Sequence, residues 1–558
     1  MTPQVHHTVG APDFIPGTVH LVDLDGTIRT AHAKGKQEDV VLVPTPSKDP
    51  DDPLNWSPRR KLLFMFSLCT YILVVGIASA AIYSVLGPIS ADSGLSISTL
   101  VEGTGYMFLT LGWGCLILQP LAMQYGKRPI YLFSTLGTMG MMLWAPHCLT
   151  TGKWIANKCL QGFFGCVIEC LCEISVADVF FAHERGAYVG VYALFLAGSN
   201  FFAPIISGFI SDGQGWKWVL HWCAIFNGAG FLILFFFMEE TNFHRQPLTS
   251  IEPDGGVEEY DSDPVYEKGP GSPLPSKEAA TPTVESTVEE GHVLEQPAGT
   301  RSYWQKLAIY RSDPLRGKAN FKGMILRPLI FASFPVIAFS GFMYGSIVCY
   351  FNILNGTSSV ILSSPPYNFS PSMVGVSYVA CLIGVFIGAY FSGPLGDKFI
   401  LWKARRNNGI MEPEHRLWLY ISLLILIPGG FLIWGIGAAH HIHWFGLVFA
   451  MGMLGCAITI GCQLPISYCI DSYKDMSGDA IVTVILIRNT MSFAVSYGVT
   501  PWMEGMGYQN AFILAAFVAM AQICLVFLFI KFGKGLRKTS VPRYWKYVNQ
   551  LMAEGLVH

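Results

Sequence analysis

Long apolar runs alternate with short polar stretches along most of the chain. Twelve runs reach about 20 residues, the length that an α-helix needs to cross the roughly 30 Å hydrocarbon core of a bilayer. Each run therefore predicts a membrane-spanning helix. The predicted spans cover residues 62–86, 100–122, 129–149, 154–181, 187–211, 218–238, 327–353, 372–394, 417–437, 443–469, 478–502 and 508–532.

The predicted spans form two groups of six, which are separated by a long polar interval. Residues 251–300 of this interval hold twelve Asp and Glu against two Lys, with many Pro, Ser, Thr and Gly. Such a composition buries too little apolar surface to offset the entropy lost on folding. We predict disordered cytoplasmic segments at 1–55 and 239–320, six-helix bundles at 56–238 and 321–532, and a cytoplasmic tail at 533–558.

The predicted fold class is thus an all-α integral membrane protein with two pseudo-symmetric bundles. A faint internal repeat agrees with this, because "PLAMQYGKR" (120–128) follows span two and "GPLGDKF" (393–399) follows span eight. Many secondary transporters consist of repeated halves with the binding site between them at the middle of the membrane.

Composition and charge placement agree with a membrane protein and predict its orientation. The 558 residues are 52% hydrophobic and only 13% charged, whereas soluble domains carry about 25% charged residues. With both termini in the cytoplasm, Lys153 and Lys217 are the only Lys or Arg residues in predicted outer loops, as the positive-inside rule requires. The sequon "NGT" at Asn355 lies on the predicted outer side, so we expect a glycan there.

Four longer motifs resemble a known family of transporters. They are "DPDDPLNWSPRRK" (49–61), "EISVADVFFAHERG" (173–186), "NNGIMEPEHRLW" (407–418) and "IDSYKDMSGDAIVTVILIRNTMSF" (470–493). Together with the six-plus-six spans, they resemble the major facilitator superfamily (MFS). Within it, the chain is similar to fungal twelve-span drug:proton antiporters, and closest to the Hol-type group associated with cations and polyamines.

The resemblance implies a gate on the cytoplasmic side. Gly126, Lys127 and Arg128 match the family's basic turn after span two, and Asp178 matches the acid that partners it at the end of span four. Gln119 and Met123 replace the glycine and aspartate of the family pattern.

Further charged residues on the predicted cytoplasmic side extend this gate. We expect ion pairs at these positions to open and close as the halves rock, although such charges also follow from positive-inside topology alone. The predicted gating residues are Lys127, Arg128, Asp178, Arg185 and Asp397, with Glu184 and Lys398 as neighbours.

Two acids, Glu169 and Glu173, lie deep in the fourth predicted span. A charge inside the bilayer costs several kcal/mol unless it faces a wet cavity or a partner. Four residues apart on a helix, the two carboxylates share one face and do not both ionise readily. One hypothesis is that a cationic substrate and protons compete for this face. The alternative is that either acid pairs with Lys158, Arg488 or backbone donors to fix helix packing.

Other polar residues inside predicted spans are also candidates for the binding site. Arg488 and Asn489 lie near mid-membrane in span eleven, where Arg488 either meets an anionic part of the substrate or neutralises a buried acid. Asn227, Tyr350, Asn352 and Gln463 are candidates to line the same cavity, and each taken alone also fits an interhelical hydrogen bond.

These observations predict a secondary active transporter with proton-coupled antiport of small organic cations or drug-like compounds. Alternatives are proton-coupled uptake of polyamines or amino-acid-like cations, and a non-transporting nutrient sensor of the same fold. Phosphate-binding loops and catalytic motifs are missing from the sequence, so we expect no enzyme activity, cofactor or metal. We expect a monomer in the plasma membrane whose partners are a small molecule, protons and lipid, with no nucleic acid.

Overall fold

The computed structural model describes residues 16–20, 49, 51–243, 305, 307–308, 321–407 and 410–553. Most of the predicted disordered segments, 1–55 and 239–320, lie outside these residues. Apart from two strands of two residues each, the regular structure of the described part is helical.

The first half of the chain forms the N-terminal bundle. Its helices are α1 (Pro58–Ala80), α2 (Leu86–Ser93), α3 (Ile97–Tyr125), α4 (Lys127–Trp144), α5 (Thr151–Gly165), α6 (Val167–Cys170), α7 (Cys172–Val179), α8 (Ala182–Gln214) and α9 (Trp216–Phe237), with short 3-10 turns η1 (Pro53–Asn55) and η2 (Ala145–His147).

The second half forms the C-terminal bundle. Its helices are α11 (Phe321–Phe331), α12 (Pro335–Ser363), α13 (Pro371–Tyr390), α14 (Gly396–Arg406), α15 (Leu423–Ala439), α16 (Trp444–Ser472) and α17 (Ser477–Ala553). A π-helical turn η4 (Phe391–Leu395) joins α13 to α14, and 3-10 segments η5 (Pro413–Ser422) and η6 (Lys474–Met476) precede α15 and α17.

Ten helices in the described part are long and apolar enough to cross a membrane. The last of them, Ser477–Leu551, contains two helices that meet at Gly507, where the backbone has φ +73°. Helix α4 is not among the ten, but it packs in the same bundle against α5 and α9. With α4 added and the long helix divided at Gly507, the structure has the twelve long helices that the apolar runs predict.

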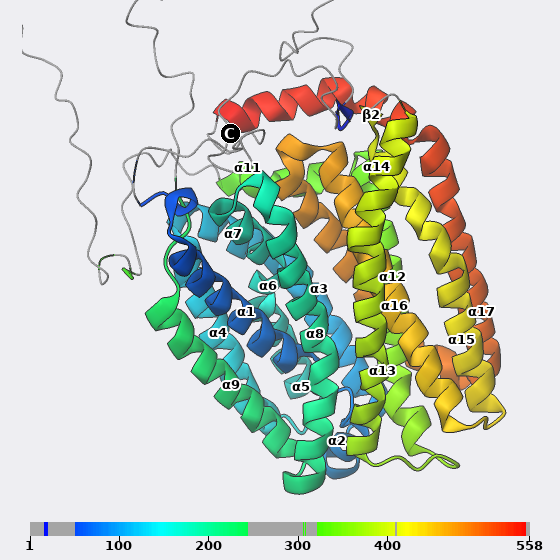
Figure 1. The fold of residues 1–558 in the computed structure, drawn as a ribbon. Helices are drawn as coiled ribbons and strands as arrows, with labels where there is room; N and C mark the ends of the chain where they lie inside the picture. The colour runs from blue at the N-terminus through cyan, green and yellow to red at the C-terminus, as the bar shows by residue number, and fades with distance from the viewer. Residues whose placement is uncertain are drawn as a thin grey trace, which may run out of the picture.

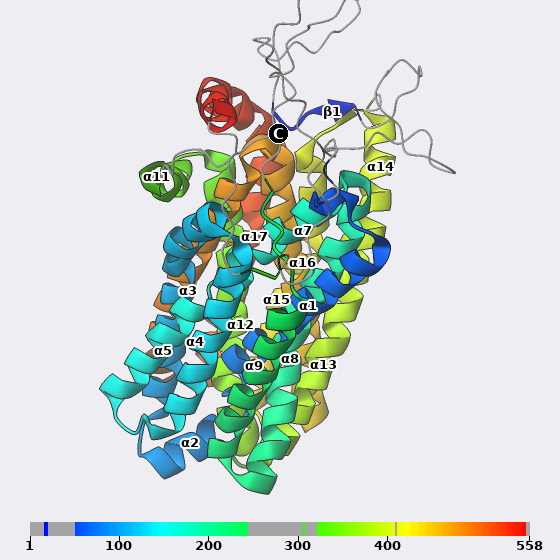
Figure 2. The ribbon, with the colours of Figure 1, turned by 90° about the vertical axis from the view of Figure 1, so that its left-hand side faces the viewer.

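The two bundles lie side by side, and each bundle is built from one half of the chain (Figure 1). They contact each other chiefly through α3 with α17 and through α8 with α13. We call the end of the molecule with α11, α14 and the C-terminal part of α17 the tail face. The opposite end, with α2, is the loop face (Figure 2).

The seventh span lies further along the chain than the sequence predicts. The predicted run 327–353 begins inside α11, whereas the spanning helix α12 is Pro335–Ser363. Asn355 is therefore inside a helix, fully buried, and it accepts a hydrogen bond from the Tyr378 hydroxyl at 3.0 Å. The prediction of a glycan on Asn355 is wrong, because this amide faces protein and has no access to solvent.

Parts of the predicted tails pack on the tail face. Strand β1 (Val19–His20) pairs antiparallel with β2 (Ile410–Met411) of the C-terminal bundle. Beyond residue 532, α17 continues as a helix across the tail face, where Figure 1 draws it in red. Its Arg537 is fully buried and donates two hydrogen bonds to Glu414, at 2.9 and 2.7 Å, and one to the Pro16 carbonyl at 2.5 Å.

Candidate functional site

Four polar side chains meet between the two bundles. Glu169 on α6 accepts hydrogen bonds from the Arg488 guanidinium and, at 3.1 Å, from the Asn489 amide, both on α17. Arg488 also donates to the Asn489 side-chain oxygen at 2.9 Å and to the Tyr344 hydroxyl on α12 at 2.8 Å. We call these four residues the Glu169 cluster. Glu169 is its only member from the N-terminal bundle.

Local packing positions the cluster. Gly112 on α3 faces Asn489, and a Cβ at that glycine would lie 2.6 Å from the Asn489 Cβ. Only a residue without a side chain allows α17 to approach α3 so closely. This approach brings Arg488 and Asn489 across the interface to Glu169.

The helix that carries Glu169 is interrupted twice. Cys166 and Leu171 separate α5, α6 and α7, although both keep right-handed helical backbone angles. The sequence predicts one continuous helix over 154–181. Glu169 lies between the interruptions, and Glu173 is half-buried one turn nearer the tail face. The two acids thus follow each other along the span toward the tail face.

The counter-charge of Glu169 is Arg488, while Lys158 lies elsewhere. The side chains of Arg488 and Glu169 are 7% and 11% exposed. Lys158 donates to the Gln161 amide oxygen at 2.8 Å and lies 5.0 Å from the centre of the Trp154 ring. Of the two partners considered for Arg488, an anionic part of the substrate and a buried acid, the structure has the buried acid beside it.

Tyr344 was missing from the predicted site. Its hydroxyl accepts from Arg488, and its ring centre lies 4.9 Å from the guanidinium carbon. The predicted Tyr350 instead packs edge-on against Phe431, with ring centres 5.5 Å apart. Tyr344 lies closer than Tyr350 to the midpoint of the predicted span 327–353, and this position was the available signal.

Two predicted cavity residues make hydrogen bonds within one bundle. Asn227 donates to the backbone carbonyls of Val74 at 3.2 Å and Cys223 at 2.8 Å, which fixes α9 against α1. Gln463 on α16 accepts from the Ser392 hydroxyl at 2.5 Å. These contacts match the interhelical alternative, and neither residue belongs to the Glu169 cluster.

Asn352 lies nearer the loop face than the cluster. It lines a small cavity of about 10 Å³ together with Thr104 and Ser496. Among the described residues, neither polar atom of its side chain has a hydrogen-bond partner. A space of this size is comparable to one water molecule.

Three of the predicted gate residues, Lys127, Arg128 and Asp178, lie at the turn between α3 and α4. Lys127 forms an ion pair with Asp178. The backbone N–H groups of Lys127 and Arg128 donate to the two carboxylate oxygens of Glu240, each at 3.0 Å. The carboxylate thus binds the free N–H groups at the start of α4, where the helix dipole favours negative charge. Gly126, with φ +115°, leaves room for it, because a Cβ there would lie 2.5 Å from Glu240.

The beginning of the predicted disordered linker belongs to this structure. Arg128 donates to the carbonyls of Phe235, Met238 and Leu307, at 2.7, 2.8 and 2.5 Å. Asn242 donates to the Met123 carbonyl at 2.7 Å. The prediction of disorder from residue 239 is therefore wrong for 239–243. Glu239 and Glu240 directly follow a span and lie on the same side as the basic turn at Lys127 and Arg128, and this was the sequence signal for an ordered contact that the prediction missed.

Of the remaining gate candidates, Asp397 does not join the two bundles. Asp397 is 68% exposed and lies 3.8 Å from Arg416, which donates to Asp471 at 2.5 Å within the same bundle. The side chains of Glu184 and Arg185 lie outside the described residues. Lys127 and Asp178 both belong to the N-terminal bundle, and Asp397 and Arg416 both belong to the C-terminal bundle. Neither pair therefore connects one bundle to the other.

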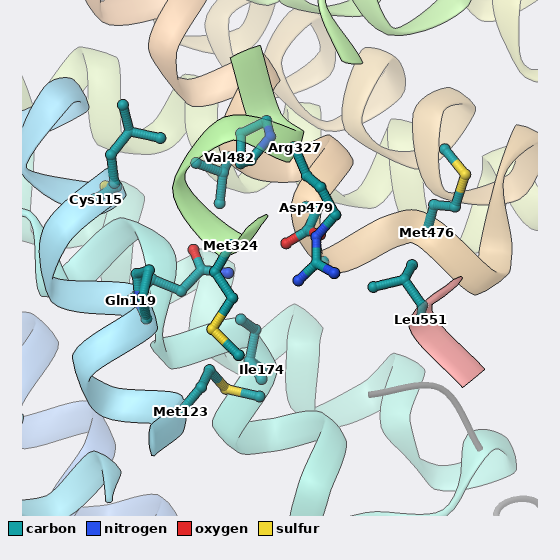
Figure 3. A pocket seen from close by; sticks show the side chains of 14 residues that line it. Cys115, Gln119, Met123, Ile174, Met324, Arg327, Met476, Asp479, Val482 and Leu551 are labelled. Carbon is teal, nitrogen blue, oxygen red and sulfur yellow. The ribbon is translucent and has the colours of Figure 1, made fainter. Parts of the chain in front are cut away.

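A cavity of about 160 Å³ lies between α3, α7, α11 and α17 (Figure 3), in the part of the molecule near the tail face. It contains the ion pair of Arg327 with Asp479, whose nearest atoms are 3.0 Å apart. None of the predicted site residues lines it.

Comparison with known proteins places these features in a family. Residues 64–475 match the model of the Major Facilitator Superfamily. An uncharacterized MFS-type transporter of Schizosaccharomyces pombe is 30% identical over 559 residues, which cover 97% of this chain and 95% of that protein. Protein HOL1 of Saccharomyces cerevisiae is 30% identical over 96% of this chain and 98% of its own length.

Solved structures show the same fold at low identity. The xylose transporter XylE from E. coli aligns with a TM-score of 0.54 at 12% identity, over 84% of this chain and 97% of its own. The human organic anion transporter MFSD10 aligns with a TM-score of 0.51 at 13% identity, over 84% of this chain and 100% of its own.

Proposed function

The chain belongs to the major facilitator superfamily of membrane transporters, and from this premise we propose that it exports small organic cations in exchange for protons. The observation that carries the proposal is the nearly buried contact of Glu169 with Arg488 and Asn489 across the two bundles. The substrate class includes drug-like amines and polyamines, as the resemblance to the Hol-type group implies.

The position of the contact supports a role in alternating access. Transporters of this fold work by rocking one bundle against the other around a central site. Because Glu169 lies in one bundle and Arg488 in the other, rocking changes the distance between them. The pair therefore breaks or re-forms during the transport cycle.

Charge counting at the cluster supports antiport. An ionised Glu169 and Arg488 together carry no net charge. A proton on Glu169 adds one positive charge, and so does a substrate cation that takes the place of Arg488 beside Glu169. In a poorly solvated site, adding both at once brings two positive charges together, which costs more than adding either one. Proton and substrate therefore exclude each other.

The tail face is the cytoplasmic side in this proposal, because nearly all Lys and Arg outside the spans that the structure describes lie at that end, and the positive-inside rule assigns such residues to the cytoplasm. The protein then works in the plasma membrane with both termini in the cytoplasm. The Glu240 carboxylate and the Lys127–Asp178 pair hold the α3–α4 turn in one shape on that side, so that the N-terminal bundle moves as a unit.

The test is cation flux in liposomes that contain the purified protein in a known orientation, with an imposed pH gradient. Labelled tetraethylammonium and spermidine are the probes. We expect wild-type protein to accumulate at least one of them against its gradient when the lumen is acidic. We expect Glu169→Gln to lose this coupling, because the side chain no longer exchanges a proton. Glu504→Gln, an exposed acid on α17, is the matched control and keeps it.

Two outcomes contradict the proposal. Full pH-driven accumulation by Glu169→Gln removes the acid from the mechanism. Movement of protons and cation in the same direction identifies symport and removes antiport.

A further inference from the structure

The cavity near the tail face is lined by a few polar side chains and by flexible apolar ones. Arg327 on α11 and Asp479 on α17 form the ion pair within it. Figure 3 shows the amide of Gln119, from α3, directed toward this pair, with the side chains of Met123 and Met324 beside it. The cavity thus joins both bundles at one place.

Gln119 is the unusual member of this lining. Its side chain is more than nine-tenths buried, with 8% of the residue exposed. Among the described residues, its amide oxygen has no hydrogen-bond partner. Leaving such a buried acceptor unpaired costs free energy, so a group that donates a hydrogen bond to it is favoured.

The size and walls of the cavity limit what this donor is. A cavity of about 150 Å³ in another protein holds one benzene molecule, and the present cavity measures about 160 Å³. Met123, Met324 and Val482 offer apolar surface, and methionine side chains adapt to differently shaped partners. The lining therefore fits a ligand of about six heavy atoms with one strongly donating polar end and an apolar body.

The cavity lies next to the Glu169 cluster along two helices. On α17, Asp479 precedes Arg488 by nine residues, which is about 13 Å along the helix axis. On α3, Gln119 follows Gly112, the residue packed against Asn489, by seven residues or about 10 Å. The cavity therefore lies about 10 to 13 Å from the Glu169 cluster along these helices, on the tail-face side of the cluster.

We propose that this cavity is a second binding station for small protonated amines, which occupy it between the tail-face solution and the Glu169 cluster. The ammonium group donates to the Gln119 oxygen and to the Asp479 carboxylate that Arg327 already neutralises in part. The alkyl part lies against Met123, Met324 and Val482. Leu551, from the helix that lies across the tail face, lines the cavity and covers this station. The assignment of amines rests on the proposed function.

The test is binding of n-butylammonium to the purified full-length protein, read as the rise of the thermal unfolding midpoint with ligand concentration. The measurement is made in Glu169→Gln protein, in which the central site no longer offers a carboxylate. We expect a saturable response that Gln119→Leu weakens by about tenfold or more, because a hydrogen bond from a charged donor is lost. Val482→Phe, which fills the cavity, abolishes it. The neutral isostere n-butanol gives no saturable response.

The outcomes separate this proposal from the proposed function. A butylammonium response that survives both Gln119→Leu and Val482→Phe overturns the second station. An equal response to n-butanol also overturns it, because the cavity then holds apolar groups such as lipid chains. If pH-driven flux proves independent of Glu169 while butylammonium still binds through Gln119, the central mechanism fails and the station stands.

Discussion

Arg488 pairs with Glu169 between the two bundles, whereas Arg537 pairs with Glu414 inside the C-terminal bundle. The Arg537 pair is bidentate, and its guanidinium is fully buried and also bonded to the Pro16 carbonyl. Arg488 reaches Glu169 through one nitrogen, and among the described residues its Nε has no hydrogen-bond partner. The Arg–Glu pair inside the C-terminal bundle thus uses more of its hydrogen-bonding groups than the Arg–Glu pair between the two bundles.

The difference follows from what each pair connects. Glu414 and Arg537 belong to elements of one bundle, η5 and α17, which the proposed rocking leaves together. This pair also anchors the segment around Pro16 against the C-terminal bundle. In the proposed transport cycle, Glu169 and Arg488 belong to bundles that move apart, so a complete set of hydrogen bonds there would oppose the motion. A buried ion pair is therefore structural or functional according to whether its partners share a rigid body.

Breaking the Arg537 pair has the largest expected effect on stability. Glu414→Gln leaves a buried guanidinium without its counter-charge, and we expect the free energy of unfolding to fall by about 3 kcal/mol. Thermal unfolding in detergent, followed by tryptophan fluorescence, measures this. Glu412→Gln is the control, because its partner Lys534 is 53% exposed and such surface pairs contribute about 1 kcal/mol or less.

The same variant separates the two regions by function. We expect Glu414→Gln protein that remains folded to keep pH-driven flux, in contrast to Glu169→Gln. If flux per folded molecule fell equally in both variants, the distinction between a structural and a functional pair would be wrong.

A smaller effect is expected from Tyr344→Phe. The change removes the hydroxyl that holds Arg488 at 2.8 Å while keeping the aromatic ring beneath the guanidinium. We expect about 1 kcal/mol less stabilisation of the Arg488 side chain, and a change in cation flux of about fivefold. Tyr350→Phe is the matched control on the same helix and leaves flux unchanged. Equal effects of the two substitutions on cation flux would show that the Tyr344 hydroxyl has no particular role in the Glu169 cluster.

The smallest effect is expected at the exposed pair on the loop face. Hydrogen bonds from Lys217 and the Trp216 indole lower the pKa of Asp92 from its ordinary value of 3.8. A lowered pKa in the folded state means that Asp92 adds stability above its ordinary pKa and loses it as pH falls through the folded value. Thermal unfolding of wild type and Asp92→Asn between pH 6 and pH 3 measures this contribution.

We expect the small advantage of wild type over Asp92→Asn to decrease as the pH falls below 3.8. It also shrinks in high salt, because exposed charges are screened. The deficit of Glu414→Gln at neutral pH resists added salt, because its partner is buried. A salt-sensitive Glu414→Gln deficit would contradict the contrast between the regions.

The apolar runs were sufficient to predict the twelve long helices, because helix length in a membrane depends on a one-dimensional property of the chain. The rule that charged and polar side chains inside a span are costly was sufficient to select Glu169, Arg488 and Asn489. It did not identify their pairing, because Glu169 and Arg488 are 319 residues apart and Lys158 was an equally good partner by sequence.

Local patterns failed where tertiary contacts override them. The sequon at Asn355 is complete, but packing of α12 against Tyr378 buries it. Glu240 follows a span in a polar stretch, and only the position of the α3–α4 turn turns it into a ligand for backbone N–H groups.

By itself, the sequence thus determined the membrane environment, the number of long helices and the charged residues that the membrane makes costly. Tertiary structure decided which of those charges meet, that Tyr344 joins them, and that Gln119 faces a cavity beside Arg327 and Asp479. The physical reason is range. Hydrophobic burial is read along one helix at a time, whereas hydrogen bonds and ion pairs require particular atoms from distant helices to lie within about 3 Å of each other.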